Sequence, residues 1–248
     1  MSDRLLVMGD VHGAYRAMTQ VLERANFDPT SDHLIFLGDV ADGWSEVPQC
    51  IDLFLDIERQ GALTAITGNH DEWLLEWAYL GQCVPEWYHQ GGASTVKAYQ
   101  PEVRSPFQAN FIPHPRIPET HTDFLSRMKL YHWDKDRNMV FTHGGFDPHF
   151  GILVAPPGGY TWDRELWQNA KVAHSRGTDH LTTYSKVFIG HTATERESLE
   201  PVRRCEIWNL DQGAGWFSRL SLMDADTEEY WQSDLTGDLY AGEKRRRG

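Results

Sequence analysis

Cysteine and long apolar runs are what this 248-residue chain has least of. Its three cysteines, Cys50, Cys83 and Cys205, are odd in number and widely spaced, so we expect buried thiols, not a disulfide framework or a zinc clip. No stretch approaches the ~20 apolar residues of a membrane-spanning helix, and the start lacks the apolar region of a secretory signal. We therefore expect a cytoplasmic protein with no membrane partner.

Basic residues are also scarce. Lys and Arg number 23 against 36 Asp and Glu, which gives a net charge of −13. Binding to nucleic acid through its phosphates needs a cationic surface, so we expect no nucleic acid partner. The composition is near the globular average and excludes disordered, collagen-like and coiled-coil chains. With no internal repeat or low-complexity linker, one domain spanning 1–248 is the simplest account.

The sequence does contain a recurring arrangement of a short apolar run, a glycine and side chains that can bind a metal. The runs, at residues 5–8, 34–37, 65–67, 139–142 and 187–189, lead into Gly9–Gly13, Gly38–Gly43, Gly68–Asp71, His143–Gly145 and Gly190–Thr192. Short apolar runs bounded by glycine are typical of strands covered on both faces. Each candidate ligand therefore follows the carboxyl end of a predicted strand.

Helical patterns separate the first of these strands. Apolar residues have helical spacing from Met18 to Ala25 and from Ile51 to Leu55, and Ser45–Pro48 is a helix start signal. Alternating strands and helices indicate an α/β fold, in which polar sites gather at the carboxyl edge of the sheet. Three later segments, 204–210, 216–223 and 229–231, are predicted to be antiparallel strands that close a second sheet.

Residues 72–130 break this alternation. They contain several tryptophans, among them Trp73, Trp77 and Trp87, and a proline-rich stretch at 101–118. We expect helices and loops that form a cap-like insertion above the site and shape a substrate groove. For any single tryptophan, packing in the core is the more common role.

The glycine segments together offer six oxygen or nitrogen donors and no thiolate: Asp10, His12, Asp39, Asn69, His143 and His191. Any one of them could be a helix cap or a surface residue, but five such segments in one chain favour a metal centre. Mixed carboxylate, amide and imidazole donors suit Mn, Fe, Zn, Co or Ni better than a structural zinc. Six donors exceed the need of one ion, and a carboxylate shared by two ions would account for them, with Asp39 as the candidate bridge.

As an ordered set, GDVHG, GDVADG, GNHD, HGG and GHT resemble the motifs of the calcineurin-like metallophosphoesterase superfamily. The resemblance is to its PPP branch of serine/threonine phosphatases, bacterial and phage phosphoprotein phosphatases and symmetrical diadenosine tetraphosphatases. The motifs span Gly9 to Thr192, and Asp211–Trp216 resembles a DTGxxW-like segment that follows in many relatives. The resemblance implies a two-sheet β-sandwich flanked by helices, in four αββα layers.

It also implies two divalent metal ions, for which we expect manganese, with Fe, Zn, Co or Ni as alternatives. One ion would be held by Asp10, His12 and the bridging Asp39, and the other by Asp39, Asn69, His143 and His191. His70 would be the general acid and Asp42 the residue that orients it, while a hydroxide between the ions attacks phosphorus.

Substrate phosphate would be bound by Arg164 and Asn69. Two arginines with which the family grips phosphate are replaced here by Gly43 and Thr67, so Arg164 is the best remaining clamp. The alternative for Arg164 is a surface ion pair with a neighbouring carboxylate.

The expected function is hydrolysis of phosphate monoesters, in a phosphorylated protein (Ser/Thr or Tyr) or a small phosphoester. The alternative is a nucleotide pyrophosphohydrolase acting on diadenosine tetraphosphate or a similar compound. An aromatic slot in the groove of residues 72–130 would favour that alternative, and an open acidic or neutral channel the phosphatase. A third reading, a catalytically silent metal-binding scaffold, is disfavoured because His70, Asp42 and all six candidate ligands are present.

Overall fold

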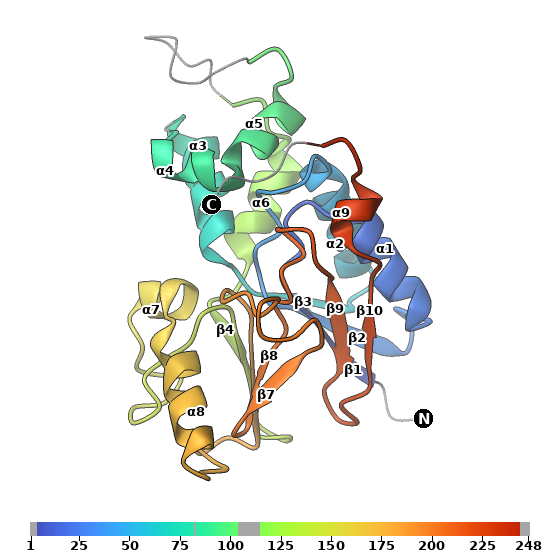
Figure 1. Ribbon diagram of the computed structural model, residues 1–248. Helices are drawn as coiled ribbons and strands as arrows, with labels where there is room; N and C mark the ends of the chain where they lie inside the picture. Colours follow the sequence, from blue (N-terminus) through green and yellow to red (C-terminus); the bar gives the residue numbers. More distant parts are fainter. Residues whose placement is uncertain (1–3, 82, 104–114, 244–248) are drawn as a thin grey trace.

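Two five-stranded sheets lie at the centre of the computed structural model, which describes residues 4–81, 83–103 and 115–243 (Figure 1). The first sheet has the order β10-β9-β1-β2-β3 and consists of β1 (Arg4–Met8), β2 (Asp32–Phe36), β3 (Leu63–Ala65), β9 (Ser221–Asp224) and β10 (Tyr230–Gln232). The second has the order β4-β5-β6-β8-β7 and consists of β4 (Tyr131–Asp134), β5 (Met139–Thr142), β6 (Lys186–Ile189), β7 (Val202–Arg204) and β8 (Ile207–Asn209).

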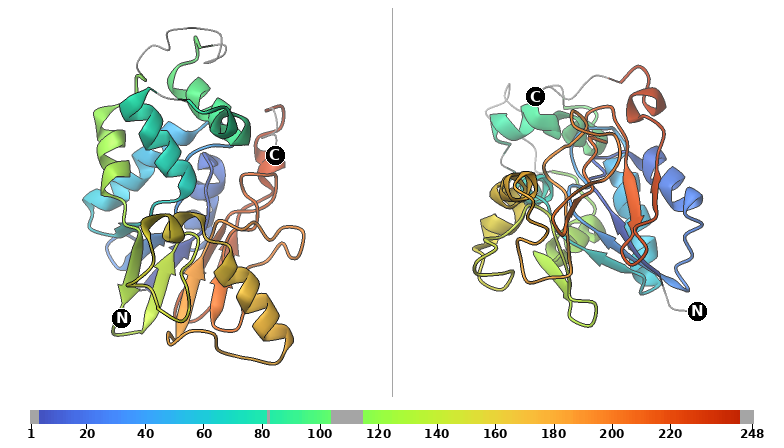
Figure 2. Two further views of the ribbon diagram at one scale, coloured as in Figure 1. Left: turned by 90° about the vertical axis from the view of Figure 1, so that its left-hand side faces the viewer. Right: turned by 60° about the horizontal axis from the view of Figure 1, so that its bottom comes forward.

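Helices cover the outer faces of both sheets, as Figure 2 shows. α1 (Tyr15–Arg24) and α2 (Val47–Arg59) pack on the first sheet, and α8 (Glu165–Ser175) packs on the second. The other described helices are α3 (Asn69–Leu80), α4 (Pro85–Trp87), the π-helical turn η1 (Tyr88–Gly92), α5 (Ala93–Tyr99), α6 (Glu119–Arg127), α7 (Pro157–Trp162) and α9 (Thr236–Leu239). The predicted αββα layering is confirmed. Within the described residues, no helix has the length and apolar character needed to cross a membrane.

The apolar runs are continuous because each central strand packs against two cores. In β1, Leu6 and Met8 contact the helices, whereas Leu5 and Val7 belong to the core between the sheets. This division follows from the alternation of side chains along a strand. On the face of the second sheet that meets this core, Phe141 of β5 stacks on Phe188 of the neighbouring strand β6, with ring centroids 5.1 Å apart. Burial on both faces thus fixes the strands that carry the site at their carboxyl ends.

The pairing of the C-terminal strands corrects the prediction for residues 204–231. β8 is parallel to β6 and antiparallel to β7, but β9 and β10 join the first sheet, where β9 is antiparallel to β1. An apolar pattern predicts that a segment is a strand but does not indicate which strand it pairs with. Here Val7 of β1 pairs with Met223 of β9, from the other end of the chain. The third predicted strand also begins earlier, at Leu63, while Ile66 forms only an isolated bridge to Lys129.

The described part of residues 72–130 is mainly helical, with short loops between the helices. Trp77 and Trp87 are buried in the same cluster as the residues that join α1 and α2 to the first sheet, and α6 packs against α2 and α3. These two aromatic side chains therefore extend the helical layer as core residues. Part of the proline-rich stretch lies outside the described residues. A cap role for this segment, and one domain spanning 1–248, stay predictions.

Candidate metal centre

The six predicted donors meet at the carboxyl ends of five strands. All are 7% exposed or less, and they follow β1 (Asp10 and His12), β2 (Asp39), β3 (Asn69), β5 (His143) and β6 (His191). The Oδ2 atom of Asp39 lies 3.6 Å from Nε2 of His12 and 3.4 Å from Nε2 of His143. Ligand atoms of Asp10, His12 and Asp39 lie within 4.8 Å of one another, as do those of Asp39, His143 and His191. Asp39 is the member that both groups share.

Glycine accompanies these donors because carboxylates lie directly against its backbone. A Cβ at Gly68 would come 2.1 Å from Oδ1 of Asp39, and one at Gly190 would come 2.0 Å from Oδ1 of Asp10. Asp39 itself has a φ of 60°, a left-handed conformation that is strained for a residue with a side chain. No larger residue fits at either glycine without moving a carboxylate.

Backbone carbonyls orient two of the imidazoles. Nδ1 of His12 donates to the carbonyl of Ala41 at 2.8 Å, and Nδ1 of His143 donates to that of Leu37 at 2.9 Å. A carbonyl oxygen can only accept a hydrogen bond, so each Nδ1 carries a proton. Each Nε2 then faces Asp39 and the other candidate metal ligands. This is the arrangement by which proteins commonly hold a metal-binding histidine.

Two buried atoms of the centre have no hydrogen-bond partner among the described residues: Oδ1 of Asp10 and Nε2 of His191. Burial and the charge of Asp211 raise the pKa of Asp10 well above its usual value. Burial and the nearby charge of His143 lower the pKa of His191 to about 2, which keeps that imidazole neutral. A divalent cation in each group of ligand atoms would partner these two atoms, and the donor set fits Mn, Fe, Zn, Co or Ni.

Asp39 and His143 form a buried ion pair. Burial alone would raise the pKa of Asp39, but the charges of His143 and His70 hold it well below its usual value. Burial alone would lower the pKa of His143, but the charge of Asp39 raises it to about 10. A cation at this centre must therefore displace a proton from His143, since only neutral imidazole binds metal.

Asp71 holds the backbone around two of the candidate ligands in place, a role that we did not predict. Its carboxylate accepts the backbone N–H groups of Asp39, Val40 and Gly68 at 2.8, 2.8 and 2.9 Å. It thereby ties the loop after β2 to the start of α3. In the sequence Asp71 closes the GNHD motif, but no local pattern showed that its carboxylate would bind backbone N–H groups of the loop after β2.

His70 and Asp42 form a hydrogen-bonded pair beside the donors. Nδ1 of His70 lies 2.7 Å from Oδ2 of Asp42, which is completely buried. The same Oδ2 accepts the indole N–H of Trp87 at 2.6 Å, and Oδ1 accepts the hydroxyl of Thr95 at 2.6 Å. Trp87 and Thr95 lie in the segment predicted to be cap-like, and no local pattern linked them to Asp42.

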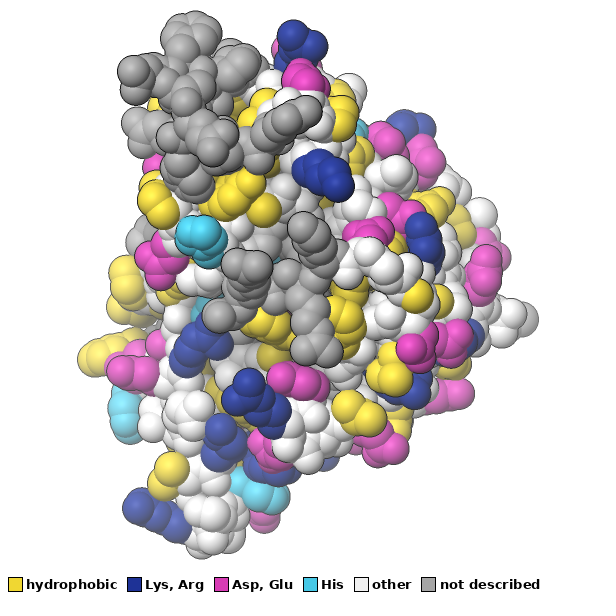
Figure 3. Space-filling model, turned by 45° about the horizontal axis from the view of Figure 1, so that its top comes forward, with side chains coloured by type: hydrophobic (Ala, Val, Ile, Leu, Met, Phe, Trp, Pro, Cys, Tyr) yellow, Lys and Arg dark blue, Asp and Glu magenta, His cyan; other side chains and the backbone are white. Residues whose placement is uncertain are grey.

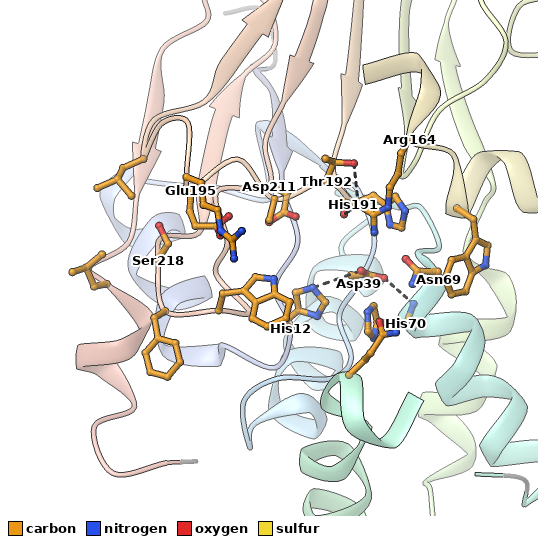
Figure 4. Close-up of a pocket in the computed structure, with 18 residues that line it drawn as sticks. His12, Asp39, Asn69, His70, Arg164, His191, Thr192, Glu195, Asp211 and Ser218 are labelled. Carbon is orange, nitrogen blue, oxygen red and sulfur yellow. Dashed lines mark hydrogen bonds and ion pairs between the residues drawn. The ribbon is translucent and has the colours of Figure 1, made fainter. Parts of the chain in front are cut away.

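The centre opens into a cleft of about 840 Å³, drawn in Figure 4. Trp162, Arg164 and Asn69 line one part, and the loops at 192–199 and 211–218 line another. Of the described residues of 72–130, only Gln90 lines the cleft. The cleft lined by the described residues therefore lies mainly outside that segment, and its role in shaping a substrate groove stays a prediction.

Arg164 reaches the edge of the centre from the start of α8. Its Nη1 donates to the carbonyl of His191 at 3.0 Å and to the hydroxyl of Thr192 at 3.2 Å. Among the described ion pairs, none joins Arg164 to a carboxylate. The alternative of a surface ion pair is therefore not what this residue forms. The amide oxygen of Asn69 lies 3.2 Å from Nε2 of His143, so Asn69 faces both the donors and the cleft.

Comparison with known proteins gives a family match and more distant relatives. A family model described as calcineurin-like phosphoesterase matches residues 3–204. The serine/threonine-protein phosphatase 1 of Salmonella typhimurium is 24% identical over 230 residues, 87% of this chain and 89% of that relative. A symmetrical bis(5'-nucleosyl)-tetraphosphatase of Photorhabdus laumondii is 28% identical over 150 residues, 60% of this chain but only 46% of that relative.

Solved structures share the fold. A presumed diadenosine tetraphosphatase aligns with a TM-score of 0.67 at 17% identity and covers 96% of both chains. A cold-active protein-tyrosine phosphatase of a Shewanella species aligns with a TM-score of 0.58 at 13% identity, covering 94% of this chain and 81% of the other.

Proposed function

This chain belongs to the calcineurin-like phosphoesterase family, and we propose that it is a two-metal phosphomonoesterase whose physiological substrate is a phosphorylated protein. The observation that carries this proposal is the position of Asp39 in both groups of buried metal-binding side chains, next to the His70–Asp42 pair. We propose Asp10, His12 and Asp39 as ligands of one ion, and Asp39, Asn69, His143 and His191 as ligands of the other. Manganese is the ion we propose first.

When bound, two such cations supply an activated water and neutralise charge on phosphoryl oxygens. The chain's own groups would do the rest. Arg164 lines the cleft, where its remaining N–H groups can bind a phosphoryl oxygen, and the amide of Asn69 lines the same cleft. Both would hold the phosphate in line for attack.

His70 would protonate the oxygen of the leaving group. Its Nδ1–H donates to Asp42, so Nε2 is the ring atom that can give a proton to the substrate. The ring is held in place because Trp73 packs edge-to-face against it with centroids 5.1 Å apart. A fixed imidazole at the wall of the cleft matches the requirement of general acid catalysis for a positioned donor.

Two observations support a phosphoprotein over diadenosine tetraphosphate as substrate. The named serine/threonine phosphatase matches 89% of its own length, whereas the named tetraphosphatase matches 46%. Besides the proposed ligand Asp39, the cleft carries two carboxylates, Glu195 and Asp211, that would repel a chain of phosphates. The diadenosine tetraphosphatase alternative keeps the support of its named relatives and of a solved structure with the same fold.

The test of the enzyme class is hydrolysis of p-nitrophenyl phosphate by the purified protein with Mn²⁺, with other divalent ions and with a chelator. We expect hydrolysis that needs a metal ion and is lost with the chelator. A panel of phosphopeptides, mononucleotides and dinucleoside polyphosphates then tests the substrate. Inactivity with every ion would overturn the enzyme class, and a preference for dinucleoside polyphosphates would overturn the phosphoprotein assignment.

A further inference from the structure

One wall of the cleft carries three polar residues that the proposed reaction does not use: Glu195, Asp211 and Ser218 (Figure 4). Oε2 of Glu195 and Oγ of Ser218 are buried and have no hydrogen-bond partner within the described part of the chain. Asp211 and Ser218 are only 5% and 6% exposed. A buried polar atom without a partner is unfavourable, so this wall is suited to a ligand that brings hydrogen-bond donors.

Tight backbone packing holds the wall in this arrangement. Oδ1 of Asp211 accepts the N–H of Gly213 at 2.9 Å, and the backbone N–H of Thr194 donates to the carbonyl of Asp211 at 2.9 Å. Gly213 has a φ of 79°, and a Cβ there would come 3.2 Å from three atoms of the Glu195 side chain. The glycine thus lets Glu195 lie close to the turn that carries Asp211.

The wall carries negative charge from Asp211 and Glu195, and the described residues neutralise little of that charge. Burial, with the charges of Asp39 and Glu195, raises the pKa of Asp211 to about 6, so this carboxylate is still mainly ionised at neutral pH. Among the described ion pairs, the one that involves this wall joins Oε1 of Glu195 to Nε of Arg196 at 3.8 Å, and the Arg196 side chain is 96% exposed. Such an exposed pair is weak. On the face drawn in Figure 3, acidic and basic side chains are interspersed.

We propose that Glu195, Asp211 and Ser218 form a subsite for a positively charged side chain of the substrate, a lysine or arginine close to the phosphorylated residue of a peptide. The inference rests on the proposed phosphoprotein phosphatase function. An ammonium or guanidinium group brings several N–H donors and the charge that two carboxylates favour. Trp216 and Phe217 line the same cleft and can pack against the cation or its aliphatic stem. A cleft of about 840 Å³ also exceeds what one phosphorylated side chain fills.

The experiment compares phosphoserine peptides that differ at one residue next to the phosphoserine: arginine, glutamine or glutamate. With the metal-loaded protein, we expect kcat/KM to be about tenfold higher for arginine than for glutamine, as ~1.4 kcal/mol of added binding gives, and lowest for glutamate. Placing the variable residue on either side of the phosphoserine in turn finds the side that reaches the wall. Each variant is judged by its arginine-to-glutamine ratio, which cancels any general loss of activity.

Three variants localise the effect. Glu195→Gln should bring the ratio close to one, whereas Glu197→Gln, whose carboxylate pairs with Arg204 and does not line the cleft, should leave it unchanged. Arg196→Ala removes the competing cation and should raise the ratio. An unchanged ratio in Glu195→Gln, or equal rates for all peptides with the unaltered protein, would overturn the subsite.

The outcomes also separate this subsite from the proposed function. Metal-dependent hydrolysis of p-nitrophenyl phosphate without discrimination among the peptides overturns the subsite alone. Inactivity toward every phosphoester overturns both. Faster hydrolysis of a ribonucleotide or sugar phosphate, with a selective loss in Glu195→Gln, would mean that the wall binds hydroxyl groups and not a cation.

Discussion

Asp42 holds His70 by a hydrogen bond of 2.7 Å between Oδ2 and Nδ1, and both side chains are buried beside the cleft. Because the Asp42 carboxylate accepts a hydrogen bond, Nδ1 of His70 carries a proton. Nε2 is therefore the ring nitrogen that can donate a proton to the substrate. A third residue, Trp87, donates to the same oxygen at 2.6 Å. The position of Asp42 thus depends on a residue that lies 45 positions later in the sequence.

Removing the imidazole should affect poor leaving groups most. We expect His70→Asn to lower kcat for phenyl phosphate by ~10²- to 10⁴-fold, the usual contribution of general acid catalysis. p-Nitrophenyl phosphate should lose much less, because its leaving group needs little protonation. Steady-state kinetics with both substrates at saturating metal would check this, and equal losses would argue against His70 as the acid.

Trp87→Phe should weaken the support of Asp42 while keeping an aromatic ring in the core. We expect kcat for phenyl phosphate to fall about tenfold, because a hydrogen bond to a charged group contributes ~1.5–3 kcal/mol. Trp77→Phe is the matched control, since Trp77 is also buried in this segment but its indole N–H has no partner among the described residues. If both variants lose the same activity, loss of packing and not of the hydrogen bond is the cause.

Asp39→Asn should cost metal as well as rate. The shared position of Asp39 predicts fewer than two equivalents of metal after dialysis, because an amide lacks the charge to bridge two cations. Elemental analysis of the purified variants measures this directly. Glu197→Gln, which removes a carboxylate outside the cleft, should keep both equivalents. Two equivalents retained by Asp39→Asn would contradict the bridging role.

Restoring the family's arginine at position 43 should lower both the stability and the activity of the protein. Gly43 has a φ of 127°, and a Cβ there would lie 2.9 Å from the carbonyl oxygen of His12. We expect Gly43→Arg to destabilise the protein by ~1–3 kcal/mol, the cost of backbone strain at one residue, and to lower activity by moving the loop of His12. Urea unfolding of the metal-free protein and kcat/KM measure the two effects.

Thr67→Arg serves as the comparison, because Thr67 is half-buried and has no positive φ. That variant should keep a stability close to that of the unaltered chain. A stable and more active Gly43→Arg would show instead that the loop relaxes to accept the side chain.

The metal donors could be predicted from the sequence because their signal is local. An apolar run, a glycine and a donor lie within about ten residues of one another, so strand, turn and ligand are read together. The close approach of Gly68 to Asp39 and of Gly190 to Asp10 gives the physical reason for the glycines in that pattern. The αββα layering followed from the same runs together with the family resemblance.

No local sequence pattern predicted the contacts between segments that lie far apart in the chain. The sequence by itself determined which residues stand at strand ends and what chemistry they bring, because side-chain alternation and turn geometry act over a few residues. Only the tertiary structure decided that β9 and β10 join the first sheet, that Trp87 and Thr95 hold Asp42, and that the loops at 192–199 and 211–218 wall the cleft. Those choices depend on how whole layers pack, and packing joins residues that no short pattern relates.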